Sequence, residues 1–303
     1  MKTPLRFHTL DVFTNTKFNG KALAVVESCD NLSDFEMSSL AREFNLPATA
    51  FLCAPRDPVN SVSLRTFVTN GAELAFSAHS LIGAAALIAQ TRALEILSRR
   101  EVVVAIETGN SVFSCEVIRS KAGVAYAQFA LEPGAAGIPP TPPDINSLAR
   151  ALSLEPRDIG FGRHAPRIYG AHRLFTLAPV ISRTAIDEAS PSGELLGEVL
   201  GETVGLLLYT SDTIEPDSAV HARLFAHTGA EDPANGEAAA AFAWAACEFE
   251  RPDDGEHQIF MEQGHRMGRP SRLTLGMNIQ GGRLQDIRLG GQAVQICKGE
   301  LEL

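Results

Sequence analysis

Two alanine-rich runs with almost no polar residues constrain the fold of this chain most. The first occupies residues 84–89 (AAALIA) and the second residues 238–246 (AAAAFAWAA). A helix that is apolar all round must be enclosed by the rest of the protein, and small alanine side chains let surrounding strands approach closely. The runs begin about half a chain apart, and each follows predicted strands and a polar loop. The sequence therefore predicts one design used twice, a cage of strands around a central helix; chance similarity of two alanine-rich helices is the alternative.

Alternating hydrophobic residues and turn signals predict strands around both runs. In the first half the expected strands lie at residues 6–13, 22–26, 49–53, 62–69, 102–107, 112–117 and 124–131. In the second half they lie at residues 173–177, 204–210, 221–225, 258–262, 271–277 and 284–289. A capping box formed by Ser33 and Glu36 predicts a helix that ends near Phe44, and a short helix is expected at residues 144–152. The fold class is therefore expected to be α+β.

The length of the chain, 303 residues, favours two domains, because a single core rarely grows beyond about 250–300 residues. Residues 132–143 (EPGAAGIPPTPP) are rich in Pro, Gly and Ala and form the best candidate for a boundary. We therefore expect an N-terminal lobe over residues 1–131 and a C-terminal lobe that begins at residue 132.

Charge and composition narrow the range of partners and locations. The net charge of -10 disfavours nucleic acid and anionic membrane as partners. No apolar run approaches the ~18 residues that span a bilayer, and no signal segment is visible in MKTPLRFHTLDVF, so a cytoplasmic location is expected. The odd set of five cysteines, without a CxxC spacing, predicts reduced thiols, most of them buried.

Motifs for common cofactors and metals are missing from the sequence. There is no GxGxxG after a strand, no GxxxxGK[ST], no HExxH and no GxSxG. The eight histidines are scattered, without the spacing of metal ligands. We therefore expect neither a cofactor nor a metal.

The starts of the two enclosed helices are the candidate site for chemistry. The first N–H groups of a buried helix need partners, and together with the helix dipole they favour an anion. His79 stands at the first helix start and Asp232 just before the second. Each could act as an acid, a base or an orienting group, although taken alone each is more often a structural histidine or a turn residue. Their matched placement favours a small carboxylate bound between the lobes.

Several segments, in order, carry a resemblance to a known family. They are HTLDVFT (8–14) with FNG (18–20) and LAVV (23–26), LAREFNL (40–46), GAELAF (71–76) before His79, RLFA (223–226), EDPA (231–234), EQG (262–264), MGRPS (267–271) and GGQAV (290–294). As a set they cover nearly the whole chain. The chain thereby resembles the phenazine-biosynthesis isomerase family.

This resemblance implies a diaminopimelate-epimerase-like fold. Two pseudo-symmetric lobes would each wrap a β-barrel-like sheet around a central helix, and a C-terminal segment at about residues 290–303 would return to the first lobe, leaving residues 132–289 as the second. Known members include cofactor-independent isomerases that move a proton on a small cyclic carboxylic acid, often as homodimers. Cysteine is absent from both helix starts, so a thiol mechanism is not expected.

The sequence departs from the family pattern at site positions. The glutamate that the family uses as its main proton carrier falls on Ala48, and a methyl group cannot carry a proton. The serine that normally helps to bind substrate falls on Glu237. In one hypothesis Glu237 supplies the missing carboxylate, with Lys21 or another cation offsetting its charge; in the other, the protein is a catalytically silent binding homologue. Glu237 could also do no more than complement the helix dipole, and Lys21 could be an ordinary solvated turn residue.

The candidate residues are therefore assigned by role as follows. The expected catalytic residues are His79, Asp232 and Glu237, and the expected substrate-binding residues are Ala48, Ala78, Ser80, Asn235 and Gly236.

Overall fold

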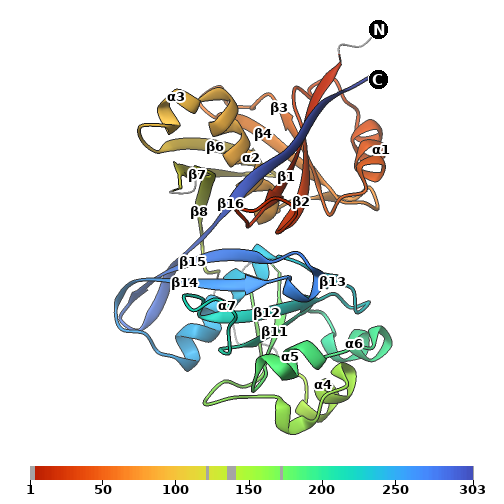
Figure 1. The fold of residues 1–303 in the computed structure, drawn as a ribbon, viewed down its shortest axis with the longest axis vertical. Helices are drawn as coiled ribbons and strands as arrows, with labels where there is room; N and C mark the ends of the chain where they lie inside the picture. Colours follow the sequence, from red (N-terminus) through yellow and green to blue (C-terminus); the bar gives the residue numbers. More distant parts are fainter. Residues whose placement is uncertain (1–3, 121–122, 135–140, 171–172, 303) are drawn as a thin grey trace. The chain divides into compact units, whose positions relative to one another are not determined.

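The chain is organised as two compact units (Figure 1). The computed structural model describes residues 4–120, 123–134, 141–170 and 173–302. Unit 1 comprises Met1–Ala130 and Gly290–Leu303, and unit 2 comprises Leu131–Leu289. Of the run at 132–143 that was predicted to be the boundary, residues 135–140 lie outside the described residues.

Unit 1 is a closed barrel of strands. In spatial order these are β1 (Leu5–Val12), β2 (Lys21–Val26), β3 (Thr49–Cys53), β4 (Val62–Phe67), β6 (Val102–Thr108), β7 (Ser111–Arg119), β8 (Ala125–Leu131) and β16 (Arg283–Leu301). The long strand β16 pairs with both β8 and β1, so the sheet closes on itself. Its pairing with β1 runs antiparallel from Leu5↔Leu301 to Val12↔Ala293.

Helix α2 (Ala78–Arg92) is the enclosed helix of unit 1. Every residue from Ala78 to Ala89 is buried, and the helix contacts strands β1, β2, β3, β6 and β7. A Cβ added at Gly83 would lie only 2.4 Å from Cδ2 of Leu23, which shows how closely the helix approaches the sheet. The prediction of an apolar helix enclosed by strands is confirmed. The short helix α3 (Leu94–Leu97) follows it.

Helix α1 (Asp34–Phe44) packs on the barrel through Met37, Leu40 and Ala41. Its capping box is formed as predicted. The Ser33 hydroxyl accepts the N–H of Glu36 at 3.3 Å, and the Glu36 carboxylate accepts the N–H of Ser33 at 2.8 Å. The cap thus fixes where the helix begins.

Unit 2 surrounds the second alanine-rich helix, α7 (Gly236–Phe249), which contacts β9, β10 and β15. Its strand order is β16, β15 (Ser271–Gln280), β14 (Gly255–Gln263), β12 (Val220–Phe225), β11 (Leu206–Thr210), β10 (Phe175–Pro179) and β9 (Arg167–Tyr169). The remaining elements are α4 (Ile145–Leu152), η1 (Pro156–Asp158), α5 (Arg183–Glu188), α6 (Gly193–Leu200) and η2 (His265–Met267).

The two units repeat one pattern of strand pairing. The pairs β2–β3 and β10–β11 are parallel, β3–β4 and β11–β12 antiparallel, and β4–β6 and β12–β14 parallel again. A two-residue strand precedes each enclosed helix, β5 (Glu73–Leu74) before α2 and β13 (Glu231–Asp232) before α7. The α+β fold with one design used twice is therefore confirmed.

Side chains repeat along with the strands. Arg65 on β4 forms a two-bond ion pair with Glu73, and Arg223 on β12 forms the same pair with Glu231. Each guanidinium also lies over the phenylalanine two residues on, at 5.3 Å and 4.7 Å from the ring centroid. This shared pattern aligns the two halves residue by residue.

The state of the cysteines and the length of the helices can be read from the structure. All five cysteines are free; Cys29 and Cys115 are buried, while Cys297 is exposed. In the described ranges, no helix combines the length and the apolar character needed to cross a membrane.

Candidate functional site

The start of α2 places His79 in the first turn of an enclosed helix. Ser77 is the N-cap, and its hydroxyl accepts the N–H of Ser80 at 3.2 Å. The His79 side chain is buried, with Nε2 3.1 Å from the carbonyl oxygen of Lys21 and the ring stacked on Phe13. Because a carbonyl only accepts, Nε2 carries the proton and Nδ1 the lone pair.

The pKa of His79 is lowered to about 3, mainly by burial and also by the charge of Lys21, against the opposing effect of the Lys21 carbonyl. Burial disfavours the charged form of an imidazole. His79 is therefore neutral at physiological pH. It can accept a hydrogen bond through Nδ1, but it holds a proton weakly.

The backbone at the start of α2 offers donors for an anion. The N–H groups of Ala78 and His79 have no acceptor within the described part of unit 1. The Ser80 hydroxyl is fully buried and likewise lacks a partner among the residues described. Buried donors without partners cost free energy, which a ligand with acceptor oxygens would recover.

Ala48 lies immediately before β3 and is 3% exposed. Its carbonyl oxygen accepts the N–H of Ala24 at 3.2 Å, which ties it to β2. The side chain brings no group that can exchange a proton. The position that the family resemblance marks as catalytic is therefore chemically inert in this chain.

The start of α7 is built from a tightly bonded loop. Asp232 accepts the N–H of Ala234 at 3.1 Å and the side-chain amide of Asn235 at 3.2 Å. Asn235 is the N-cap, and its Oδ1 accepts the N–H of Ala238 at 3.0 Å. Gln263 on β14 holds both ends of the loop, since it donates to the Asp232 carbonyl and accepts the N–H of Asn235. The functional groups of Asp232 and Asn235 thus help to shape the loop.

Glu237 is the second residue of α7, with its side chain 16% exposed. Its Oε2 lies 3.8 Å from Nη1 of Arg173. The positive end of the helix dipole also favours a carboxylate here. The compensating cation was expected to be Lys21 or another residue, and Arg173 is the one found in the same unit.

The internal repeat relates the two helix starts directly. The same interval along the chain separates the N-caps Ser77 and Asn235 and the second helical residues His79 and Glu237. Asp232 is equivalent to Leu74 of unit 1. At one repeat position, unit 1 therefore carries a neutral imidazole and unit 2 a carboxylate.

The predicted residues fall into two sets. Unit 1 brings Ala78, His79 and Ser80 together on one helical turn and also contains Ala48. Unit 2 brings Asp232, Asn235, Gly236 and Glu237 together at one loop and helix start.

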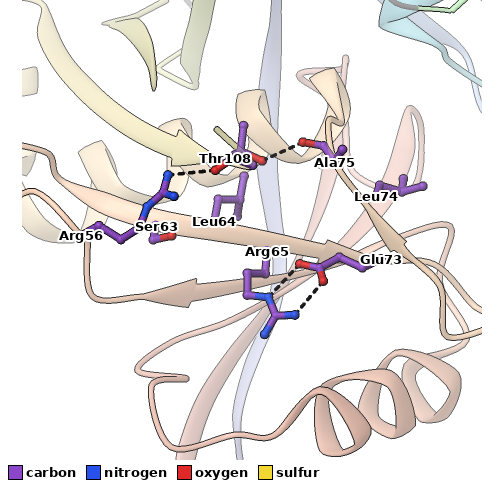
Figure 2. Close-up of a pocket in the computed structure, with 9 residues that line it drawn as sticks. Arg56, Ser63, Leu64, Arg65, Glu73, Leu74, Ala75 and Thr108 are labelled. Atoms are coloured by element: carbon purple, nitrogen blue, oxygen red, sulfur yellow. Dashed lines mark hydrogen bonds and ion pairs between the residues drawn. The ribbon is translucent and has the colours of Figure 1, made fainter. Parts of the chain in front are cut away.

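A pocket in unit 1 was not predicted from the sequence. Its volume is about 450 Å³, and it is lined by Arg56, Ser63, Leu64, Arg65, Glu73, Leu74, Ala75, Thr108 and Gly109. Figure 2 shows the Arg65 guanidinium facing the Glu73 carboxylate there, at 2.7 and 2.6 Å. Arg56 donates to the Gly109 carbonyl at 2.8 Å. Both cations of the pocket are thus bonded to the protein itself, and none of the predicted site residues lines it.

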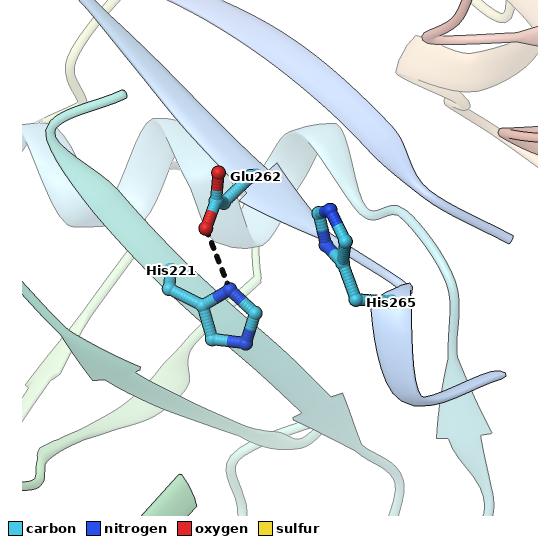
Figure 3. A group of neighbouring side chains, drawn as sticks. All are labelled: His221, Glu262 and His265. Carbon is cyan, nitrogen blue, oxygen red and sulfur yellow. Dashed lines mark hydrogen bonds and ion pairs between the residues drawn. The ribbon is translucent and has the colours of Figure 1, made fainter. Parts of the chain in front are cut away.

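A second cluster that the sequence did not reveal lies in unit 2 (Figure 3). His221 on β12 contacts Glu262 on β14, with Nδ1 2.8 Å from Oε1, and His265 follows in η2. One ligand atom from each residue lies within 4.8 Å of the others. The signal was hidden because parallel pairing of β12 with β14 brings together residues far apart in the sequence.

Comparisons with known proteins show the family of this chain and agree with its fold. The family model described as phenazine biosynthesis-like protein matches residues 10–299. A protein of Mesorhizobium japonicum named as an isomerase is 33% identical over 96% of this chain and 96% of its own length. The trans-2,3-dihydro-3-hydroxyanthranilate isomerase of Pseudomonas chlororaphis is 25% identical over 97% of this chain and 98% of its own length. Among solved structures, a PhzF-family protein of Bacillus anthracis covers 100% of both chains at 20% identity, with a TM-score of 0.84.

Proposed function

Since this chain belongs to the family of phenazine biosynthesis-like proteins, we propose that it is an isomerase that moves a proton on a small carboxylic acid without a cofactor. Each unit contributes one enclosed helix start to the binding of the substrate. Backbone N–H groups there donate hydrogen bonds to the carboxylate, and side chains of the first turn act on the neighbouring carbon.

One observation carries this proposal. The two helix starts combine unsatisfied backbone donors with an ionisable side chain at the same repeat position, His79 in one unit and Glu237 in the other. The N–H of Gly236, like those of Ala78 and His79, has no acceptor among the described residues. Enclosed donors of this kind are suited to a carboxylate oxygen.

The roles of the side chains follow from their surroundings. Glu237 moves the proton, because it is a carboxylate at a helix start with Arg173 nearby. His79 stays neutral and orients the substrate through Nδ1, because its lowered pKa makes it a poor base. Asp232 shapes the loop and orients the substrate, and Ala48, Ala78, Ser80, Asn235 and Gly236 form the remaining wall of the site.

Replacement of the family's glutamate by Ala48 limits the choice of substrate. Loss of one acid or base group typically costs a factor of about 10²–10⁴ in rate. We therefore expect weak turnover of trans-2,3-dihydro-3-hydroxyanthranilate, the compound in the name of the Pseudomonas chlororaphis relative. A different small carboxylic acid, whose geometry suits a carboxylate at residue 237, is the proposed substrate.

Incorporation of solvent deuterium tests the proposal. The protein is incubated in D₂O with a panel of small cyclic carboxylic acids, and deuterium at carbon is followed by NMR. The wild type should incorporate deuterium into at least one of these acids, and Glu237→Gln should slow that incorporation by about 10²–10⁴-fold. Glu194→Gln is the matched control, because Glu194 is also a first-turn glutamate of unit 2, on α6. Exchange that survives Glu237→Gln would dismiss Glu237 as the acid.

The second candidate is a catalytically silent binding protein of the same fold. It is favoured by Ala48 and by the use of the Asp232 carboxylate and the Asn235 amide within their own loop. A carboxylate that binds saturably yet shows no exchange would support it. We also propose a homodimer, which rests on the family resemblance, and a cytoplasmic location, which rests on the sequence.

A further inference from the structure

The His221–Glu262–His265 cluster contains two imidazoles that the equivalent positions of unit 1 lack. Glu107 and Glu262 occupy equivalent places, each opposite a residue of the neighbouring parallel strand, Ser63 and His221. Glu107 holds a loop by accepting the backbone N–H groups of Arg56 and Asp57, both at 2.9 Å. Its other donors are the side chains of Arg56 and Asn60.

Glu262 performs the same loop-holding task in unit 2. It accepts the N–H of Ile214 at 2.6 Å and that of Glu215 at 3.0 Å. Unit 1 shows that this task needs no imidazole. Unit 2 nevertheless places two, His221 where unit 1 has Ser63 and His265 where unit 1 has Asn110, the third residue after each glutamate.

Two groups of the cluster, the Glu262 carboxylate and the His265 imidazole, keep a lone pair that no hydrogen bond among the described residues uses. A carboxylate offers about four lone-pair sites, and the three hydrogen bonds to Glu262 leave one on Oε2. Nδ1 of His265 is buried and has no hydrogen-bond partner among the residues described. His221 and Glu262 are 2% and 1% exposed. An unpaired buried nitrogen costs free energy, and a metal ion would recover that cost.

We propose that His221, Glu262 and His265 form a binding site for one divalent first-row transition ion such as Zn²⁺. Two imidazoles and one carboxylate are ligands that such ions accept, with water completing the coordination. At tetrahedral angles, bonds of about 2.1 Å put ligand atoms about 3.4 Å apart, so the three ligand atoms, which lie within 4.8 Å of one another, would move closer together on binding. His265 would move toward the other two ligands, because it lies in a short turn flanked by Gly264 and Gly268, both with positive φ.

The proposed ion would also lie close to the candidate active site of unit 2. Gln263, between Glu262 and the turn of His265, bonds the backbone of Asp232 and Asn235. A Cβ added at Gly264 would lie 2.6 Å from the Pro233 carbonyl oxygen, so the backbone beside His265 rests on the same loop. The bound ion would thus stabilise the loop that precedes α7. The site stands independently of the proposed isomerase activity.

Zinc titration of the chelator-stripped full-length protein tests the site. Calorimetry should show one equivalent of Zn²⁺ per chain with a Kd at or below about 1 µM. The thermal midpoint should rise with added Zn²⁺, because an ion that binds only the folded state stabilises it. Absence of saturable binding, or a stoichiometry other than one, would overturn the proposal.

Substitutions in unit 2 that copy the equivalent residues of unit 1 test which side chains bind the ion. His265→Asn and His221→Ser install the residues that the equivalent positions of unit 1 already carry, and each should weaken Zn²⁺ binding by at least about 10–100-fold. His257→Gln is the control, since His257 lies on β14 outside the cluster and bonds the Asp253 carbonyl. Unchanged affinity in both cluster variants, or an equal loss in His257→Gln, would rule the site out.

Discussion

At the scale of single residues, Ala48 keeps a backbone hydrogen bond of the fold but has no side-chain group for acid/base chemistry. Its carbonyl oxygen bonds the N–H of Ala24, while its side chain is a buried methyl group at the position where the family resemblance implies a glutamate. We propose that this replacement removed a proton carrier. Restoring that group is a direct test of what the substitution removed.

Ala48→Glu should raise turnover of trans-2,3-dihydro-3-hydroxyanthranilate by about 10²–10⁴-fold over the wild type, because it returns an acid/base group to the frame. It should also lower the unfolding free energy, since a carboxyl group replaces a buried methyl. Steady-state kinetics and urea unfolding measure the two effects. Ala48→Gln, of similar size but unable to carry the proton, is the matched control. Equal turnover by both variants would show that the carboxyl group is not what the chain lacks.

His79 gives a prediction on pH because its pKa is lowered to about 3 in the folded state. The unfolded value is about 6.5, so between these values the unfolded chain binds more protons. This contribution to stability is therefore complete above pH 6.5 and is lost as the pH falls from there toward 3. His79→Gln should reduce the loss of unfolding free energy between pH 7 and pH 4.5, measured by urea unfolding at both values. An unchanged loss would contradict the burial of a neutral imidazole against Phe13 and Lys21.

At the scale of elements, local signals predicted most helices and strands. The capping box at Ser33 and the apolar runs were sufficient for α1, α2 and α7. Helices α3, α5 and α6, strand β9 and the two-residue strands β5 and β13 were missed, because short elements depend on tertiary partners more than on periodicity. The strand predicted at 284–289 continues to Leu301 as β16, through pairing with β1 that no local pattern reveals.

Gly83 tests how closely α2 packs in its barrel. Alanine normally favours a helix interior over glycine by about 1 kcal/mol, but here its Cβ would meet Leu23 at 2.4 Å and Val12 at 3.1 Å. Overpacking costs about 1–3 kcal/mol, so Gly83→Ala should lower the unfolding free energy. Gly197→Ala on α6 is the control, because its nearest contact is an ordinary 3.7 Å and it should stabilise the protein. Chemical denaturation compares the two; stabilisation by both would disprove close packing around α2.

At the scale of the whole molecule, the repeat explains which candidate residues could be placed from the sequence. His79 and Glu237 could be placed at helix starts because each opens an alanine-rich helix, a feature of the sequence itself. Arg173 beside Glu237 and the cluster at His221 were not found, because they depend on strand pairing between distant segments. Local helix signals thus predict the helix starts, whereas the neighbours that strand pairing brings together can be identified only in the folded chain.

Strand β16 is the long-range element on which the barrel of unit 1 depends. It pairs with β1 along residues 293–301 and also with β8, so a break in it opens two strand edges at once.

Val294→Pro should break the ladder opposite Asp11, because proline has no N–H and interrupts a strand paired on both sides. Hydrogen exchange should then show lost protection in β1, while β11 and β12 of unit 2 remain protected. Val294→Thr keeps the N–H and a β-branched shape, so it should leave β1 protected. Equal protection of β1 in the proline variant would mean that the barrel holds together without this closing strand.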